Sequence, residues 1–121
     1  MIAVNPMAAK LVISNQDRYD EYILLIDGAD SAEVFPLATV TVELPPGVHA
    51  VSFRSKAETE LPLTCKPIRV TLKEGAALSL QVKTQNLTIR IYDTQECQLN
   101  ARQGFLCGRV ADGAYVENPI E

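Results

Sequence analysis

The chain has 121 residues, 47% of them hydrophobic and 21% charged, which indicates one folded domain and excludes a low-complexity or wholly disordered chain. Eleven basic against fifteen acidic residues give a net charge of −4, and the basic residues are scattered singly, so no nucleic-acid partner is expected. The longest apolar run, from Tyr22 to Ile26, is far shorter than the roughly 18 residues of a membrane helix. We therefore expect a soluble domain without membrane insertion.

The first ten residues do not resemble an export signal. No basic segment precedes the apolar residues, and Pro6 interrupts an apolar run that is already too short for the core of a signal peptide. The default expectation is a cytoplasmic protein. If a leader was removed, a periplasmic or surface location follows instead.

Short segments in which apolar and polar residues alternate predict β-strands along most of the chain. Between residues 38 and 44, for example, Val40, Val42 and Leu44 share one face, and polar side chains occupy the other. The predicted strands are 10–14, 22–27, 38–44, 48–55, 68–72, 78–84 and 87–92. The pattern predicts an all-β fold, an antiparallel β-sandwich of about seven strands, Ig-like or transthyretin-like, with an irregular C-terminal segment.

The inward positions of these strands define the expected core. Its members are Val40, Val42, Val51, Phe53, Ile68, Val70, Leu78, Leu80, Ile89 and Ile91. Residues 22–26 are apolar at both odd and even positions, which predicts a strand in the middle of a sheet with both faces covered, or one that lies against a partner.

Three groups of turn-forming residues separate predicted strands. Pro45-Pro46-Gly47 is typical of a type II turn, which predicts a hairpin between the strands on either side. The sequence 73–75 ends in a glycine suited to a bulged hairpin. Residues 84–86 are expected to reverse the chain as a three-residue turn, because the inward positions change parity across them; one long bulged strand is the alternative that also changes the parity.

The pattern decays after Asp93, which divides the chain into a sandwich domain of residues 1–93 and a C-terminal extension of residues 94–121. The extension contains apolar residues that the predicted core does not need: Phe105, Leu106, Val110, Tyr115 and Val116. Such side chains either cover an open sheet edge within the chain or contact another subunit. We take these five as the candidate interaction residues.

The three cysteines, Cys65, Cys97 and Cys107, contain no CxxC pair, so the common zinc and thioredoxin signatures are absent. Without an export signal, free and mostly buried thiols are expected. A single bridge between Cys97 and Cys107 stays open as an alternative, since Gly104 lets that segment fold back.

His49 is the only histidine and thus the only ready general base near neutral pH. It falls on the inward face of its strand, where a ring nitrogen is expected to bond a loop carbonyl and close the end of the sandwich. No motif surrounds a Cys65–His49 pair, and the spacing of cysteines, His49 and acidic residues matches neither a zinc nor a calcium site. We expect no catalytic residue, metal or cofactor.

The segments 23–28, 41–51 and 68–80 together resemble PEGA-type domains and the small bacterial β-sandwich domains found on lipoproteins. In those families a strand ending in Asp-Gly precedes a Leu-Pro-Pro-Gly-x-His-x-Val hairpin and a later Lys-x-Gly turn, as Leu44 to Val51 and Lys73 to Gly75 do in this chain. The likeness covers residues 11–92 and implies a surface-associated binding or spacer module. The first cysteine is Cys65, so the lipid anchor of such proteins is not carried over.

These observations favour a non-enzymatic module for protein interaction or structural assembly, with a protein partner or self-association as a homo-oligomer. The alternative is a small thiol-dependent enzyme or redox protein that uses Cys65, Cys97 or Cys107.

Overall fold

A computed structural model of the chain describes residues 7–56, 63, 65–100 and 113–117. Within these ranges the chain forms nine β-strands and no helix, which confirms the predicted all-β class. The strands are β1 (Ala9–Asn15), β2 (Tyr22–Ile26), β3 (Ala29–Val34), β4 (Thr39–Leu44), β5 (Gly47–Ser55), β6 (Ile68–Leu72), β7 (Ala77–Gln85), β8 (Thr88–Tyr92) and β9 (Ala114–Glu117).

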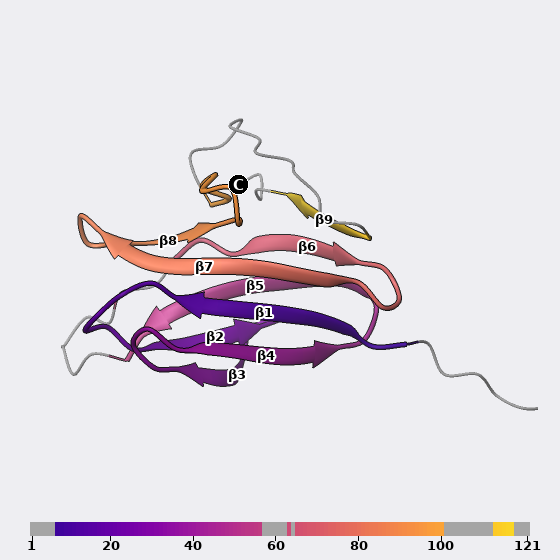
Figure 1. The fold of residues 1–121 in the computed structure, drawn as a ribbon, viewed down its shortest axis with the longest axis horizontal. Coiled ribbons are helices and arrows are strands. Elements are labelled where there is room, and N and C mark those ends of the chain that lie inside the picture. Colours follow the sequence, from indigo (N-terminus) through magenta and orange to yellow (C-terminus); the bar gives the residue numbers. More distant parts are fainter. Residues whose placement is uncertain (1–6, 57–62, 64, 101–112, 118–121) are drawn as a thin grey trace, which may run out of the picture.

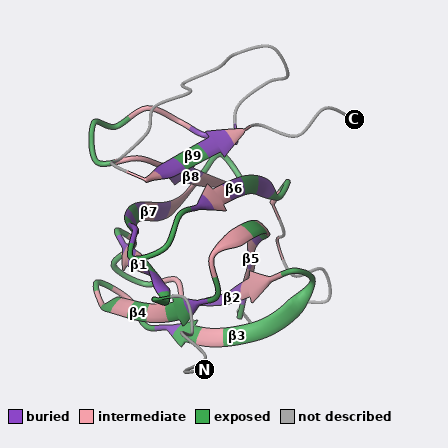
Figure 2. Cartoon of the chain, turned by 90° about the vertical axis from the view of Figure 1, so that its right-hand side faces the viewer, coloured by how far each residue is buried: buried purple, intermediate pink, exposed green. Residues whose placement is uncertain are grey.

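The strands form two sheets that face each other as a β-sandwich (Figure 1). Sheet A has the order β4-β1-β7-β8, and sheet B has the order β3-β2-β5-β6-β9. All pairs of neighbouring strands are antiparallel except β1 and β7, which run parallel. Figure 2 looks along the strands and shows β3 and β4 on one side of the sandwich and β8 and β9 on the other.

The core lies between the sheets and matches the predicted core closely. All predicted core residues are buried except Val40 and Val42, which are half-buried. Both belong to β4, which is an edge strand of sheet A among the described residues and therefore has a neighbouring strand on one side alone. Residues 22–26 form β2, which lies inside sheet B between β3 and β5, as their apolar pattern predicts.

Two of the predicted hairpins are wrong. β4 and β5 belong to different sheets, and so do β6 and β7, so the connections at residues 45–46 and 73–76 cross from one sheet to the other. The glycines still have the predicted positive φ, 133° at Gly47 and 73° at Gly75. A turn sequence therefore predicts the change of direction, but it leaves open whether the next strand pairs with the last or faces it across the core.

β7 and β8 do form a hairpin, but its turn differs from the predicted one. Strand β7 continues to Gln85, and the two turn residues are Asn86 and Leu87, with φ of 53° and 60°. A two-residue turn with positive φ at both positions is the usual connection of a tight hairpin. Leu87 is consequently exposed at the tip, instead of beginning the inward face of β8.

The sequence pattern did not predict β3 or β9. The side chains of β3 are mostly exposed, so the strand has no alternating apolar face. β9 has four residues and pairs with β6 at the edge of sheet B.

The described part of the predicted C-terminal extension packs on the edges of both sheets. The Leu99 amide donates to Ile91 O at 2.7 Å, and the Asn100 side chain bonds the backbone of Ile89 and Ile91, so residues 98–100 lie along β8. β9 lies along β6 in the other sheet. Leu99, Ala114 and Val116 are part of the core: the sandwich extends beyond Asp93.

Candidate functional site: the apolar loop end

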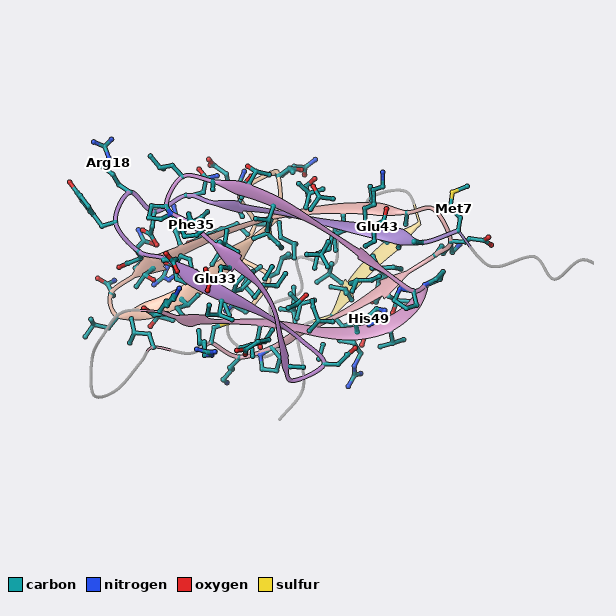
Figure 3. The ribbon with its side chains drawn as sticks, turned by 90° about the horizontal axis from the view of Figure 1, so that it is seen from below. Met7, Arg18, Glu33, Phe35, Glu43 and His49 are labelled. Atoms are coloured by element: carbon teal, nitrogen blue, oxygen red, sulfur yellow. The ribbon has the colours of Figure 1, made fainter. Side chains whose placement is uncertain are left out.

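Successive strands run in opposite directions, so the connections that follow β1, β3, β5 and β7 gather at one end of the sandwich. The connections at this end that are described over their full length are residues 16–21, 35–38 and 86–87. We call it the loop end. Figure 3 shows Arg18 and Phe35 there, and Met7, Glu43 and His49 toward the opposite end.

Large apolar side chains are exposed on all three of these connections. Their exposed fractions are 86% for Tyr19, 54% for Phe35, 64% for Leu37 and 81% for Leu87. We call these four residues the apolar loop patch. All four lie on connections at the same end of the sandwich. A group of exposed apolar side chains on one part of a surface typically marks a contact site.

Asn15, at the end of β1, holds two of the loops in place. Its buried side-chain amide donates to the carbonyls of Asp20, Val34 and Phe35 at 2.8–3.2 Å. Its Oδ1 accepts the amide of Asp17 at 2.8 Å. One buried side chain therefore bonds backbone groups of both connections and holds the segments that carry Tyr19, Phe35 and Leu37.

Asp17, at the loop end, forms hydrogen bonds with residues of both sheets. Its carboxylate accepts the Tyr22 hydroxyl and, at 2.8 Å, the amide of Thr84, while Leu37 donates its amide to Asp17 O. The Tyr22 hydroxyl also contacts Thr84 Oγ1. Burial and the bond to Asp17 raise the Tyr22 pKa far above its ordinary value, so the hydroxyl stays a donor. This network joins β2 of sheet B to β7 of sheet A.

Leu37 and Leu87 both have left-handed backbone conformations, with φ of 58° and 60°. Glycine and asparagine adopt this conformation readily, whereas a leucine is strained in it. Both leucines are also largely exposed, so neither side chain repays the strain by burial in the core. Leucine at these two positions is therefore unexplained by folding stability.

A hollow of about 310 Å³ lies beside the patch and is lined by Tyr19, Asp20, Glu21 and Lys56. Lys56 Nζ pairs with Glu21 at 3.0 Å and with Glu33 at 2.9 Å, which raises the Lys56 pKa. The loop end therefore combines exposed aromatic and aliphatic side chains with charges of both signs.

Of the five candidate interaction residues in the C-terminal extension, the structure describes Tyr115 and Val116, which lie on opposite faces of β9. Val116 is buried in the core, whereas Tyr115 is 43% exposed on the outer face of sheet B. Phe105, Leu106 and Val110 lie outside the described residues. β9 pairs with β6 and so covers a sheet edge of its own chain, which is one of the two roles that the sequence left open.

His49 has the structural position that the sequence predicts. Its Nε2 bonds Pro45 O at 2.7 Å and its Nδ1 bonds Asp27 Oδ2 at 2.9 Å, at the end opposite the loops. Burial of the ring opposes its charged form, but these two bonds outweigh that effect and raise the His49 pKa. The bond to His49 and the amide of Ala50 lower the Asp27 pKa. Both ring nitrogens are thus engaged in closing this end.

Cys65 is a free thiol beside Phe53, whose amide points to Sγ at 3.2 Å. Burial raises the pKa of the Cys65 thiol to about 11. Phe53 lies four residues from His49 along β5, which is about 13 Å in a strand, so the structure does not bring Cys65 and His49 together.

The expectation of three free thiols is wrong for Cys97, which is disulfide-bonded. Cys107 lies outside the described residues. Two cysteines ten positions apart carry too little local pattern to show whether the segment between them folds back, which is why the sequence left this open.

Among the described residues no group of three or more His, Cys, Asp or Glu side chains is arranged to hold a metal ion. That part of the chain also contains no helix of the length and apolar character needed to cross a membrane.

Sequence reasoning missed the apolar loop patch. A usable signal existed, because Tyr19, Phe35 and Leu37 are apolar residues in segments between predicted strands, where no core position requires them. Leu87 could not be recognised in this way, because it continues the period-two spacing of Ile89 and Ile91 and so resembles an inward strand position.

Comparisons with protein-family models, with curated protein sequences and with solved structures found no match. The resemblance to PEGA-type domains therefore stays a prediction.

Proposed function

We propose that this chain is a non-enzymatic interaction module that binds a protein partner through the apolar loop patch. The observation that carries the proposal is the pair of strained, exposed leucines, Leu37 and Leu87. A residue that costs folding energy and gains no burial is best explained by a contact made with another molecule. The rigid support from Asn15 and Asp17 reduces the entropy that such a contact would lose.

The surroundings of the patch favour a protein over other partners. Tyrosine, phenylalanine and arginine are enriched in the centres of protein interfaces, and Tyr19, Phe35 and Arg18 all belong to connections at this end. The net charge of −4 disfavours nucleic acids and anionic membranes. PEGA-type domains, which the chain resembles, are mostly binding or spacer modules.

The alternative of a thiol-dependent enzyme has less support. A thiol with a pKa of about 11 is protonated near neutral pH, and Cys65 is a poor nucleophile in that state. His49, the only histidine, is already bonded through both ring nitrogens.

The proposal is tested by photo-crosslinking from a single position. A photoreactive amino acid at Leu37 should capture a protein in cells that express the chain, and the same group at Val48 should not. Val48 is a matched control because it is 59% exposed and lies on β5, near the opposite end of the sandwich.

The captured protein is then purified and its affinity measured. The double substitution Leu37→Ser and Leu87→Ser should weaken binding at least tenfold, while Val48→Ser should leave the dissociation constant unchanged. Equal capture from both positions, or unchanged affinity of the double variant, would overturn the proposal. Binding of the purified chain to protein-free lipid vesicles that depends on the same two leucines would overturn it in favour of a membrane surface.

A further inference from the structure

The four edges of the two sheets are protected to different degrees. The β8 edge is bonded to residues 98–100. The β3 edge is interrupted by an irregularity opposite Leu24 and Leu25, and its Asp30 and Glu33 form ion pairs. β9 has only four residues. Short strands, bulges and charges are the usual devices that prevent a sheet from pairing with another chain.

Of these devices β4 has only the single charge of Glu43, and it has no bulge. It pairs with β1 in an unbroken register over its whole length, and its sequence alternates threonine with valine before Glu43 and Leu44. Such a strand has high β-propensity and contains no proline, lysine or bulge. Among the described residues, β4 is the edge that is open to another strand.

The hydrogen bonds on either side of β1 show which groups of β4 face outward. The amide of Asn15 donates to Ala38 O, whereas the amides of Lys10 and Gln16 donate to the β7 side of the sheet. Odd residues of β1 therefore bond β4, and their partners are the even residues Val40, Val42 and Leu44. The N–H and C=O groups of Thr39, Thr41 and Glu43 point away from β1, toward the open edge.

We infer that β4 pairs with β4 of a second copy of this chain, antiparallel and centred on Thr41, to form a symmetric dimer. This register places Thr41 opposite its own copy and Thr39 opposite Glu43, so every outward-facing group finds a partner. About six new backbone hydrogen bonds result. A register displaced by two residues would bring Pro45, which has no N–H, opposite Thr39 and lose part of the set.

The side chains are self-complementary in the same register. On the outer face, threonine meets threonine and Glu43 meets Thr39, so no like charges oppose each other directly. On the inner face, Val40 meets Val42 of the second copy, which covers the two core positions that are only half-buried in the single chain. Closure of the pair about a two-fold axis makes a discrete dimer, because both β4 edges are then occupied.

The neighbouring edge does not oppose this arrangement. β3 lies on the same side of the sandwich as β4 (Figure 2), so the dimer would bring two β3 strands near each other. Their carboxylates, Asp30 and Glu33, are already paired with Arg54 and Lys56.

The oligomeric state of the purified full chain tests the inference. Sedimentation velocity over a range of concentrations should show a monomer–dimer equilibrium. Thr41→Lys places two ammonium groups opposite each other at the two-fold axis and should weaken dimerisation at least tenfold. Thr71→Lys is the matched control, because Thr71 lies on the outer face of sheet B, and it should dimerise as the unchanged chain does.

Amide hydrogen exchange tests the register itself. The amides of Thr39, Thr41 and Glu43 should become protected as the concentration rises, while that of Thr88, on β8, should not change. Dimerisation should also survive the Leu37→Ser and Leu87→Ser double substitution, which separates it from partner binding at the loop end. A chain that stays monomeric at all concentrations, or a dimer that tolerates Thr41→Lys and leaves the three amides unprotected, would overturn the inference.

Discussion

Replacing Leu87 by glycine should stabilise the protein, although it removes a large apolar side chain. Leu87 has a φ of 60° and is 81% exposed at the β7–β8 turn. Removing a side chain from the left-handed region releases about 1–2 kcal/mol of strain. The greater freedom of glycine in the unfolded chain opposes this by about 0.5–1 kcal/mol.

The net gain therefore lies between about 0 and 1.5 kcal/mol, because little buried area is lost with an exposed side chain. The preceding residue is Asn86, so the substitution creates the Asn-Gly pair that this turn type favours. For a domain of this size a gain of 1 kcal/mol raises the melting temperature by roughly 3–5 °C.

Urea denaturation and thermal melting of Leu87→Gly, Leu87→Ala and the unchanged chain measure this effect. Alanine removes most of the side chain but keeps a Cβ in the strained conformation, so Leu87→Ala should gain no stability. Both variants should lose partner affinity if Leu87 contributes to a contact. A glycine variant that is less stable than the unchanged chain, or no more stable than the alanine variant, would refute the strain argument and remove the main support for the proposed function.

Three further predictions concern the core and the support of the two ends. Val70→Ala should lower the free energy of unfolding, measured with urea, by about 1–3 kcal/mol because Val70 is fully buried. Thr71→Ala should lower it by less than about 0.5 kcal/mol. Equal losses would contradict the assigned faces of β6. Asn15→Ala leaves buried carbonyls without a donor and should lower the free energy of unfolding by about 2 kcal/mol. Amide hydrogen exchange in residues 16–21 and 35–38 should become faster. Unchanged exchange there would argue against the supporting role of Asn15. The folded pKa of His49 is raised, so its bond to Asp27 should stabilise the chain fully below about pH 6.5 and lose that contribution as the pH rises through the folded pKa. His49→Gln should flatten this part of the stability profile, and parallel profiles for the two chains would show that the pair contributes nothing.

The strands whose two faces differ in environment were predictable from the sequence. In β6 and in residues 51–55 of β5, every second residue is buried, so the alternation that marks a half-buried strand is present in the residues themselves. β3 shows the limit of this signal: its side chains are mostly exposed, and a strand without a buried face has no alternation to read.

The loop end was less predictable than the core. The sequence shows that Leu37 lies between strands, but it does not show the positive φ of Leu37 or the bond from its amide to Asp17 O, twenty residues earlier. The support from Asn15 has no local signal, since its partners are backbone carbonyls that any residue type supplies. A contact of this kind cannot be predicted before the tertiary structure shows that the two loops lie side by side.

The sequence by itself determined the β class, the inward residues of the regular strands, the sites of chain reversal and the closing role of His49. These properties depend on interactions within a few residues or on the two-residue period of a strand, and both can be recognised directly in the sequence. Only the tertiary structure decided that β4 and β5, and likewise β6 and β7, lie in different sheets and that β1 runs parallel to β7. It also decided that β4 is an edge strand. Strand pairing depends on backbone groups that are the same at every residue, so the choice among partners is made by how the two sheets pack together.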